Sequence, residues 1–139
     1  LLHHYGINST ETEVARLAHT RPGSGTSRLG LFRALKILTR GKPGMRVRIV
    51  RCDGEGLLRR NRPAVITVGL TENPRTEEEI KAATLWNWQP GAVHDVTFLG
   101  RDETNPSKIR IGEPEFGLEK WDAGALDFLY KNMAIFIEG

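Results

Sequence analysis

The hydrophobic pattern changes its period once along this chain, near the Gly-Lys-Pro-Gly run at 41–44. Before that run, apolar residues recur at helical spacing and share one face, as do Leu31, Ala34, Leu35 and Leu38. After it, strand-like alternation begins, with basic residues between Met45, Val47 and Ile49. Because one segment cannot satisfy both periods, the sequence predicts helices first and a sheet second, which is an α+β arrangement.

Two helices are indicated before this change of period. The first begins after Ser9 or Thr10, and Glu13 stands three residues after Thr10 in the capping-box position. The second is capped by Thr26 or Ser27 and runs to about residue 38. These two helices are expected to pack on the sheet that follows.

The rest of the chain favours a mostly antiparallel sheet. Strands are expected over 45–50, 64–68, 92–100, 108–113 and 133–137. A turn is predicted at 52–56, a short helix capped by Thr76 lies inside the long segment 69–91, and another helix starts at Asp122 as its N-cap.

Length and composition limit the possible classes of protein. With 139 residues the sequence predicts a single domain over 1–139, and no apolar run reaches the length of a membrane span. The net charge is +3, with arginine and lysine concentrated in 40–62. That segment lacks the interleaved aromatic residues of a base-stacking surface, so a solvated basic strand face is favoured and no nucleic-acid partner is expected.

Cys52 is the only cysteine, so the chain cannot form an internal disulfide. The acidic residues Asp53 and Glu55 follow it in the predicted turn and disfavour a thiolate, so we expect an inert thiol. The histidines do not stand at the spacing of a ligand set, and neither a metal nor a cofactor is expected.

The segments 92–100 and 108–114 read as a hairpin with a polar turn between them. If Gly100 pairs with Ser107, then Phe98 faces Ile109, Val96 faces Ile111, and His94 faces Glu113. A carboxylate opposite an imidazole can fix its tautomer, which is half of a catalytic triad. The alternative is a structural ion pair at the end of a core hairpin.

The tryptophans Trp86 and Trp88 precede this hairpin, at the end of the long segment 69–91. A long connection next to a candidate histidine is a common place for a lid or a substrate-binding wall, so both are candidate substrate contacts. Equally, large aromatic residues near turns often anchor a loop onto its domain.

A resemblance to a known family rests on short stretches that occur in order along the chain. They are 5–7, 9–17, 25–27, 29–31, 33–34, 63–66, His94, Val96, 98–100, Ile109, 111–114 and 116–117. Together they resemble the papain-like cysteine peptidases that process double-glycine leaders of bacteriocins, which occur alone or fused in front of ABC exporters.

The resemblance implies a papain-like fold, a bacterial protein, a peptide or protein substrate and possibly an ABC exporter as parent or partner. It places His94 at the general base and Glu113 at the orienting acid. Three features depart from the family pattern. Glu113 replaces an aspartate, the segment 69–91 is longer than usual, and Asp95 follows the histidine where an aromatic or apolar residue is usual.

The family nucleophile is a cysteine at the N-terminus of an earlier helix, and only the end of that helix is expected at 1–5. We therefore expect a partial peptidase domain that lacks its N-terminal nucleophile segment and is inactive as given. The alternative is a non-catalytic domain that binds a peptide or an exporter substrate. The enzyme assignment depends on an upstream cysteine, and the sequence leaves the compartment open between bacterial cytoplasm and cell envelope.

Overall fold

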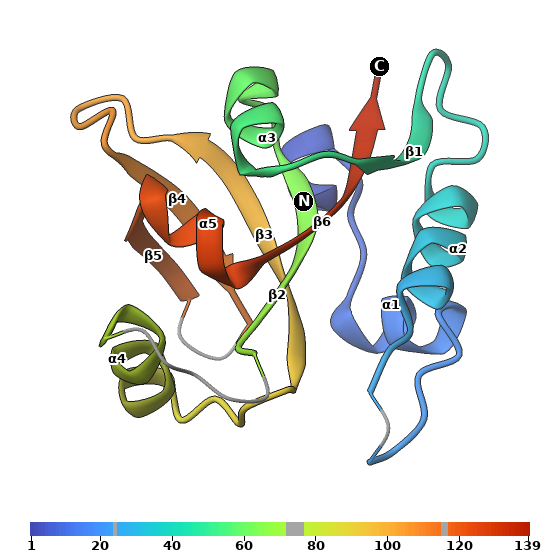
Figure 1. Cartoon of the computed structure of the whole chain (residues 1–139). Helices are drawn as coiled ribbons and strands as arrows, with labels where there is room; N and C mark the ends of the chain where they lie inside the picture. Colours follow the sequence, from blue (N-terminus) through green and yellow to red (C-terminus); the bar gives the residue numbers. More distant parts are fainter. Residues whose placement is uncertain (24, 72–76, 115–116) are drawn as a thin grey trace. The chain divides into compact units, whose positions relative to one another are not determined.

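The computed structural model describes residues 1–23, 25–71, 77–114 and 117–139, and within α4 it does not describe the side chains of residues 78, 82 and 86. The chain forms two compact units (Figure 1). One comprises Leu1–Ile49 with Ile135–Gly139, and the other comprises Val50–Ala134. The assignment of 1–139 to a single domain stays a prediction.

The first unit contains the N-terminal helices. A short 3₁₀ helix, η1 (Leu2–Tyr5), precedes α1 (Glu11–Leu17) and α2 (Arg28–Leu38). Thr10 caps α1 by accepting a hydrogen bond from Glu13 N at 3.1 Å, and Ser27 caps α2 by accepting from Gly30 N at 3.0 Å. Both predicted helices are confirmed, and the structure selects one of the two candidate caps at each.

Six strands form one sheet in the order β1-β6-β2-β3-β4-β5. Their bounds are β1 (Arg46–Arg51), β2 (Ala64–Gly69), β3 (Val93–Arg101), β4 (Lys108–Glu113), β5 (Gly117–Asp122) and β6 (Tyr130–Glu138). The pairs β2–β3, β3–β4 and β4–β5 are antiparallel. The α+β class and the antiparallel sheet are confirmed, whereas β5 was not expected from the sequence.

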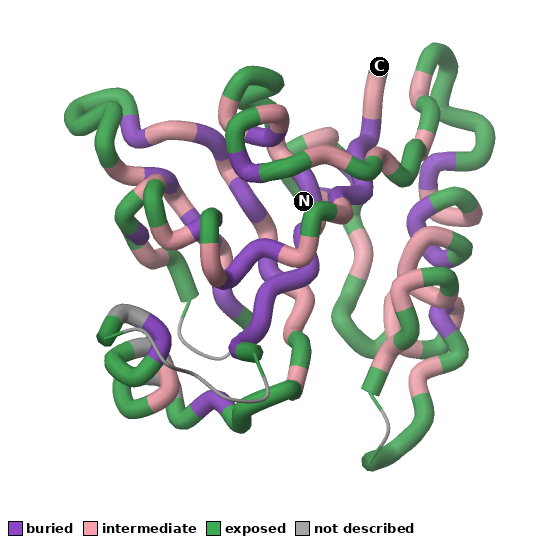
Figure 2. Tube along the Cα trace, viewed as in Figure 1, coloured by how far each residue is buried: buried purple, intermediate pink, exposed green. Residues whose placement is uncertain are grey.

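Alternation along the strands separates buried from accessible side chains (Figure 2). Phe98, Ile109 and Ile111 have no accessible surface, and Trp121 in β5, which pairs with Ile109, retains 4%. These residues form the apolar core of one sheet face, the face on which His94 was placed. Among the described residues, no helix is long and apolar enough to span a membrane.

The predicted turn at 52–56 is wrong, because α3 (Gly54–Arg60) begins there. Asp53 caps this helix by accepting from Gly56 N at 2.8 Å, and Leu57 is fully buried. The cap and the burial of Leu57 outweigh the low helix propensity of two glycines. The helix ends at Asn61, which has a left-handed backbone (φ 45°).

The helix expected at Asp122 is also different. Asp122 ends β5 and makes no capping hydrogen bond, and its carboxylate pairs with Lys108 Nζ at 2.7 Å. The helical turns that follow are η2 (Ala123–Ala125) and α5 (Leu126–Leu129). The helix α4 (Glu77–Trp86) lies where a short helix was predicted, but its expected cap Thr76 lies outside the described residues.

The predicted register of the β3–β4 hairpin is wrong by two residues. Phe98 pairs with Ile111 and Arg101 pairs with Ile109, with a β-bulge between them. At the bulge, Gly100 has φ +102°, and Asn61 Oδ1 accepts a hydrogen bond from Arg101 N at 2.8 Å. The extra residue and a different turn therefore replace the expected pairing of Gly100 with Ser107.

The turn itself is built by Asp102, whose backbone N donates to Lys108 O at 2.9 Å. Asp102 Oδ1 accepts from Thr104 N at 2.8 Å and from Asn105 N at 3.2 Å, and its Oδ2 pairs with Lys120 Nζ at 2.7 Å. Because the net shift of register is two residues, an even number, each side chain keeps the face that was predicted for it.

Candidate active site

His94 is the second residue of β3 and lies on the buried face. It stands two and four residues before Val96 and Phe98, which are 1% and 0% exposed. Its ring packs against the Trp88 ring with a centroid distance of 5.0 Å and an interplanar angle of 33°. The ring nitrogen Nε2 is buried and has no hydrogen-bond partner among the described residues. An unpaired buried polar atom costs about 1–3 kcal/mol, so a hydrogen bond to this nitrogen would be stabilising.

Glu113 ends β4 on the same face, because it follows Ile109 and Ile111 in the alternation of that strand. It is a buried acid, 8% exposed. Thr97 pairs with Gly112, so continuing the register by one residue sets Glu113 opposite Val96 rather than opposite His94. His94 and Glu113 are therefore diagonal neighbours, at a Cα separation of about 7–8 Å. The predicted direct opposition is wrong, but the two side chains share one face of adjacent strands.

Trp88 is 5% exposed and contacts two rings of the same cluster. Besides His94, it meets Trp121 edge to face at a centroid distance of 5.9 Å and 64°. It therefore offers almost no surface to a peptide, and its contacts are those of a packing residue that supports the imidazole. Trp86 is the last residue of α4, and its side chain lies outside the described part of the chain.

Trp121 was not recognised as part of this site from the sequence. The sequence pattern predicts a helix start at Trp121, whereas the structure puts this residue in β5, opposite Ile109. Its Nε1 donates to Glu119 Oε2 at 2.8 Å, which fixes the indole at the edge of the cluster. The sequence of 117–122 carries almost no alternating signal for a strand, because Trp121 is its one buried side chain and Leu118 is exposed.

The neighbouring Asp95 points to the other face of the sheet. Its Oδ1 accepts from Thr67 Oγ1 at 2.8 Å, and Thr67 is its registered partner in β2. Asp95 therefore joins two strands, and it is not a second acid on the His94 face.

Cys52 has its own polar neighbour, since its Sγ lies 3.5 Å from the Tyr130 hydroxyl. The helix α3 that follows it lies beside the Arg101 end of β3 in Figure 1, where Asn61 binds Arg101 N. His94 lies seven residues before Arg101, about 23 Å away along an extended strand.

The Tyr130 hydroxyl beside Cys52 has a perturbed pKa. Burial is the largest cause and the contact with the Cys52 thiol is the next, and together they raise the pKa of Tyr130 well above its usual range.

No group of three or more His, Cys, Asp or Glu side chains in the described ranges could hold a metal ion. The site consists of an imidazole and a carboxylate on one sheet face, with Trp88 packed on the imidazole and Trp121 packed on Trp88. Such a pair can relay a proton to or from a group placed beside the imidazole.

Comparison with solved structures identifies proteins that share this fold. No family model and no curated protein matches the sequence. Among solved structures, the peptidase domain of Streptococcus ComA, a bifunctional ABC transporter of a quorum-sensing pathway, superposes with a TM-score of 0.66 at 20% identity. That match covers 99% of this chain and 83% of the ComA domain.

A double-glycine-motif protease from an AMS/PCAT transporter, solved with its leader peptide, has a TM-score of 0.69 at 15% identity, covering 99% of this chain and 76% of the protease. The peptidase domain of Streptococcus mutans ComA has a TM-score of 0.59 at 19% identity, with 90% and 84% covered. At these identities the likeness shows the fold, and it confirms the architecture that the sequence resemblance implies. This chain has the α+β fold of peptidase domains from ABC transporters.

Proposed function

We propose that this chain is part of a papain-like cysteine peptidase of the leader-processing type, in which His94 is the general base and Glu113 orients it. The observation that carries the proposal is that both side chains lie on one face of adjacent strands, in a chain with the fold of transporter peptidase domains. The substrate is a peptide or protein segment that binds in an extended form beside the imidazole.

In this mechanism each nitrogen of His94 has one task. The buried Nε2 has no hydrogen-bond partner among the described residues in this structure, and in the proposed active form it donates to the Glu113 carboxylate, which holds the imidazole in one tautomer. Nδ1 takes the proton of a cysteine thiol as sulfur attacks the scissile carbonyl, and then gives it to the leaving amine as the C–N bond breaks. Water hydrolyses the resulting thioester with His94 again as the base. Trp88 limits rotation of the ring through its contact with one face.

The nucleophile in this proposal is not Cys52. That thiol contacts the Tyr130 hydroxyl at 3.5 Å and precedes a helix at the other end of β3 from His94. The thiol would belong to a cysteine of the parent protein outside these 139 residues, which leaves this chain with the base and the acid. An exporter that carries the peptidase would then supply the leader peptide.

One observation favours a second function. His94 Nε2 has no hydrogen-bond partner among the described residues, so the bond from Nε2 to the Glu113 carboxylate that the peptidase mechanism requires is not formed in this structure. A domain that binds a peptide or an exporter substrate without cutting it would not need that bond. The second candidate is therefore a non-catalytic, peptidase-like binding domain.

Alkylation of the full-length parent protein separates the two candidates. At neutral pH, iodoacetamide should modify one cysteine other than Cys52 rapidly, and His94→Ala should slow that reaction strongly. His3→Ala is the matched control, because His3 is exposed and lies outside the site. Slow modification of every cysteine, together with binding of an uncut double-glycine peptide, would contradict the peptidase and support the binding domain.

The imidazole–carboxylate pair can be tested in the 139-residue chain itself. Nitrogen-15 shifts of the imidazole rings report which nitrogen carries the proton. Glu113→Gln should change the tautomer ratio of His94 and leave that of His3 unchanged, because an amide can both donate and accept. An unchanged His94 tautomer would remove Glu113 from the proposed mechanism.

A further inference from the structure

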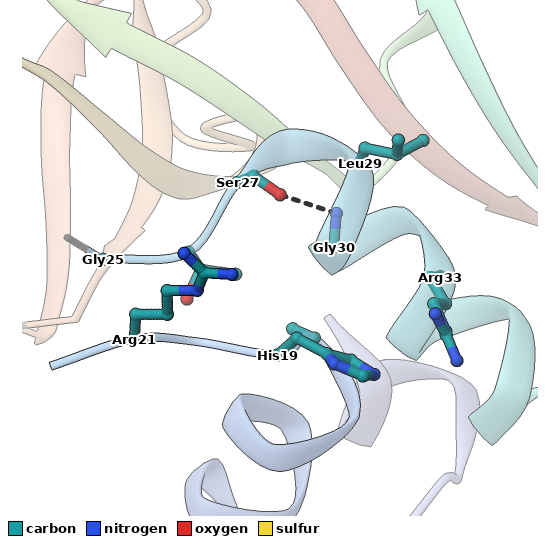
Figure 3. A pocket seen from close by; sticks show the side chains of 9 residues that line it. His19, Arg21, Gly25, Ser27, Leu29, Gly30 and Arg33 are labelled. Carbon is teal, nitrogen blue, oxygen red and sulfur yellow. Dashed lines mark hydrogen bonds between the residues drawn. The ribbon is translucent and has the colours of Figure 1, made fainter.

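A basic trough runs along α2 in the first unit, apart from the candidate active site. It begins as a hollow of 460 Å³ between the helix and the connection that precedes it (Figure 3). His19 and Arg21 lie on that connection, and Leu29 and Arg33 lie on α2. The figure also shows Ser27 bound to Gly30 N, which fixes the start of the helix.

A second hollow of 1160 Å³ continues from the first. It is lined by α2, the connection that follows it and β1, and it shares Leu29 and Arg33 with the first hollow. Since the two hollows have lining residues in common, they form one trough along α2. Every residue that lines it belongs to the same compact unit.

The charge of the trough is of one sign. The second hollow alone is lined by six cations, Arg33, Lys36, Arg40, Lys42, Arg46 and Arg48, and none of the lining residues of either hollow is acidic. Within the described part of the chain, the ion pair recorded for these six joins Arg48 to Glu138 at 3.4 Å. Because like charges repel, an anionic partner would relieve this concentration of charge.

The trough also has an apolar strip. Leu29 is 71% exposed, and the half-buried Phe32 and Ile37 lie farther along the same helix. Lys36 Nζ lies 5.6 Å from the centre of the Phe32 ring, so the cation borders the apolar strip. An exposed apolar strip rimmed by charge is typical of an interaction site.

We propose that this trough binds an acidic amphipathic helix of a partner protein. The eleven residues of α2 extend about 16 Å, which is the length of three turns of a bound helix. The apolar side of such a helix would cover Leu29 and Phe32, and its acidic side would meet the cations of the rim. The second hollow is lined by one aromatic ring, which is too few for the bases of a nucleic acid to stack on. A concave surface also fits a cylindrical helix better than it fits a flat lipid bilayer.

The test uses a fluorescein-labelled, 18-residue probe peptide with leucines on one helical face and glutamates on the other. Its binding to the 139-residue chain is measured by fluorescence anisotropy, beside a matched peptide in which lysine replaces every glutamate. We expect the acidic peptide to bind, the basic peptide not to bind, and affinity to fall as salt rises from about 50 to 300 mM.

Variants then locate the contact. The double variant Arg33→Glu/Lys36→Glu should weaken binding about tenfold or more, and the neutral substitution Leu29→Ser should weaken it by a factor that does not depend on salt. The matched control Arg62→Glu/Lys81→Glu makes the same change of net charge at two exposed residues outside the trough and should bind as the parent chain does. Circular dichroism of each variant checks that the fold is intact.

The proposal is overturned if the control pair weakens binding as much as the trough pair does, because net charge alone would then explain the affinity. It is equally overturned if anionic phosphatidylglycerol vesicles or a short RNA duplex bind to the chain more tightly than the acidic peptide. Neither outcome bears on His94, so the trough and the proposed peptidase mechanism fail separately.

Discussion

Gly100 controls the geometry of the β3–β4 hairpin, and replacing it with alanine is the sharpest test of the fold described above. Its φ of +102° lies in a region that side chains rarely adopt, which costs about 1–3 kcal/mol in a residue with a Cβ. An added Cβ would stand 3.0 Å from Asn61 Oδ1, the acceptor for Arg101 N. Displacing that acceptor costs about another 1 kcal/mol. We expect Gly100→Ala to destabilise the chain by about 3 kcal/mol.

Urea unfolding, followed by circular dichroism, measures this change. For a chain of this size the dependence of free energy on urea is about 1–3 kcal/mol per molar, so the midpoint should fall by about 1 M or more. Gly112→Ala is the matched control in the same hairpin. A Cβ there would meet Thr97 Cβ at 3.5 Å, an ordinary contact, and alanine is favoured over glycine in a strand by about 0.5–1 kcal/mol.

The two glycine variants should therefore change stability in opposite directions. A Gly100→Ala chain as stable as the parent would refute the reasoning, because the bulge would then not need glycine. Combining it with Asn61→Ala provides a second check. The two substitutions should be non-additive by about 0.5 kcal/mol or more, since the added methyl group acts partly through the Asn61 side chain.

Three further predictions concern individual side chains. The Lys120 ammonium and then the turn hydrogen bonds hold the pKa of Asp102 well below its usual range, so its contribution to stability is present above about pH 4 and lost as the pH falls below that value. Asp102→Asn should flatten the dependence of the urea midpoint on pH in that acidic range, and an unchanged slope would contradict the assignment. Burial, followed by the Cys52 thiol, raises the pKa of Tyr130, so stability should decline as the pH rises above about 10 and Tyr130→Phe should remove that decline. Absorbance at the tyrosinate band checks it, because one of the two tyrosines should ionise only on unfolding. Trp88→Ala should destabilise the chain by about 3–5 kcal/mol in calorimetry, and a loss below about 1 kcal/mol would show that its burial is not structural.

The elements that local signals define were predicted well. Thr10 with Glu13, and Ser27 with Gly30, form caps within four residues of chain, so the starts of α1 and α2 could be placed from the sequence alone. The α+β class followed from one change of hydrophobic period. In contrast, α3 contains two glycines in its first turn, and propensity argued against it, although its capping aspartate and one buried leucine were enough to form it.

β5 was missed for a different reason. It is the edge strand, and along it only Trp121 is buried while Leu118 is 69% exposed. An edge strand with one buried side chain leaves almost no alternating pattern, so its existence depends on pairing with β4.

The candidate site shows the same division between local and distant signals. Alternation placed His94 and Glu113 on one face, and that holds because the register differs by an even number of residues. The register itself is set by Asn61, forty positions before Arg101 in the sequence, and no local pattern reveals that contact. Likewise, nothing in the sequence indicated that Trp88 packs on the imidazole.

The contact between Trp88 and His94 gives this molecule an intrinsic optical probe. Indole emission responds to the polarity of its surroundings. With the two ring centres 5.0 Å apart, a molecule that contacts the imidazole also changes the surroundings of a native fluorophore. Anything that approaches the histidine, including an inhibitor or a peptide, can thus be followed by light without attaching a dye.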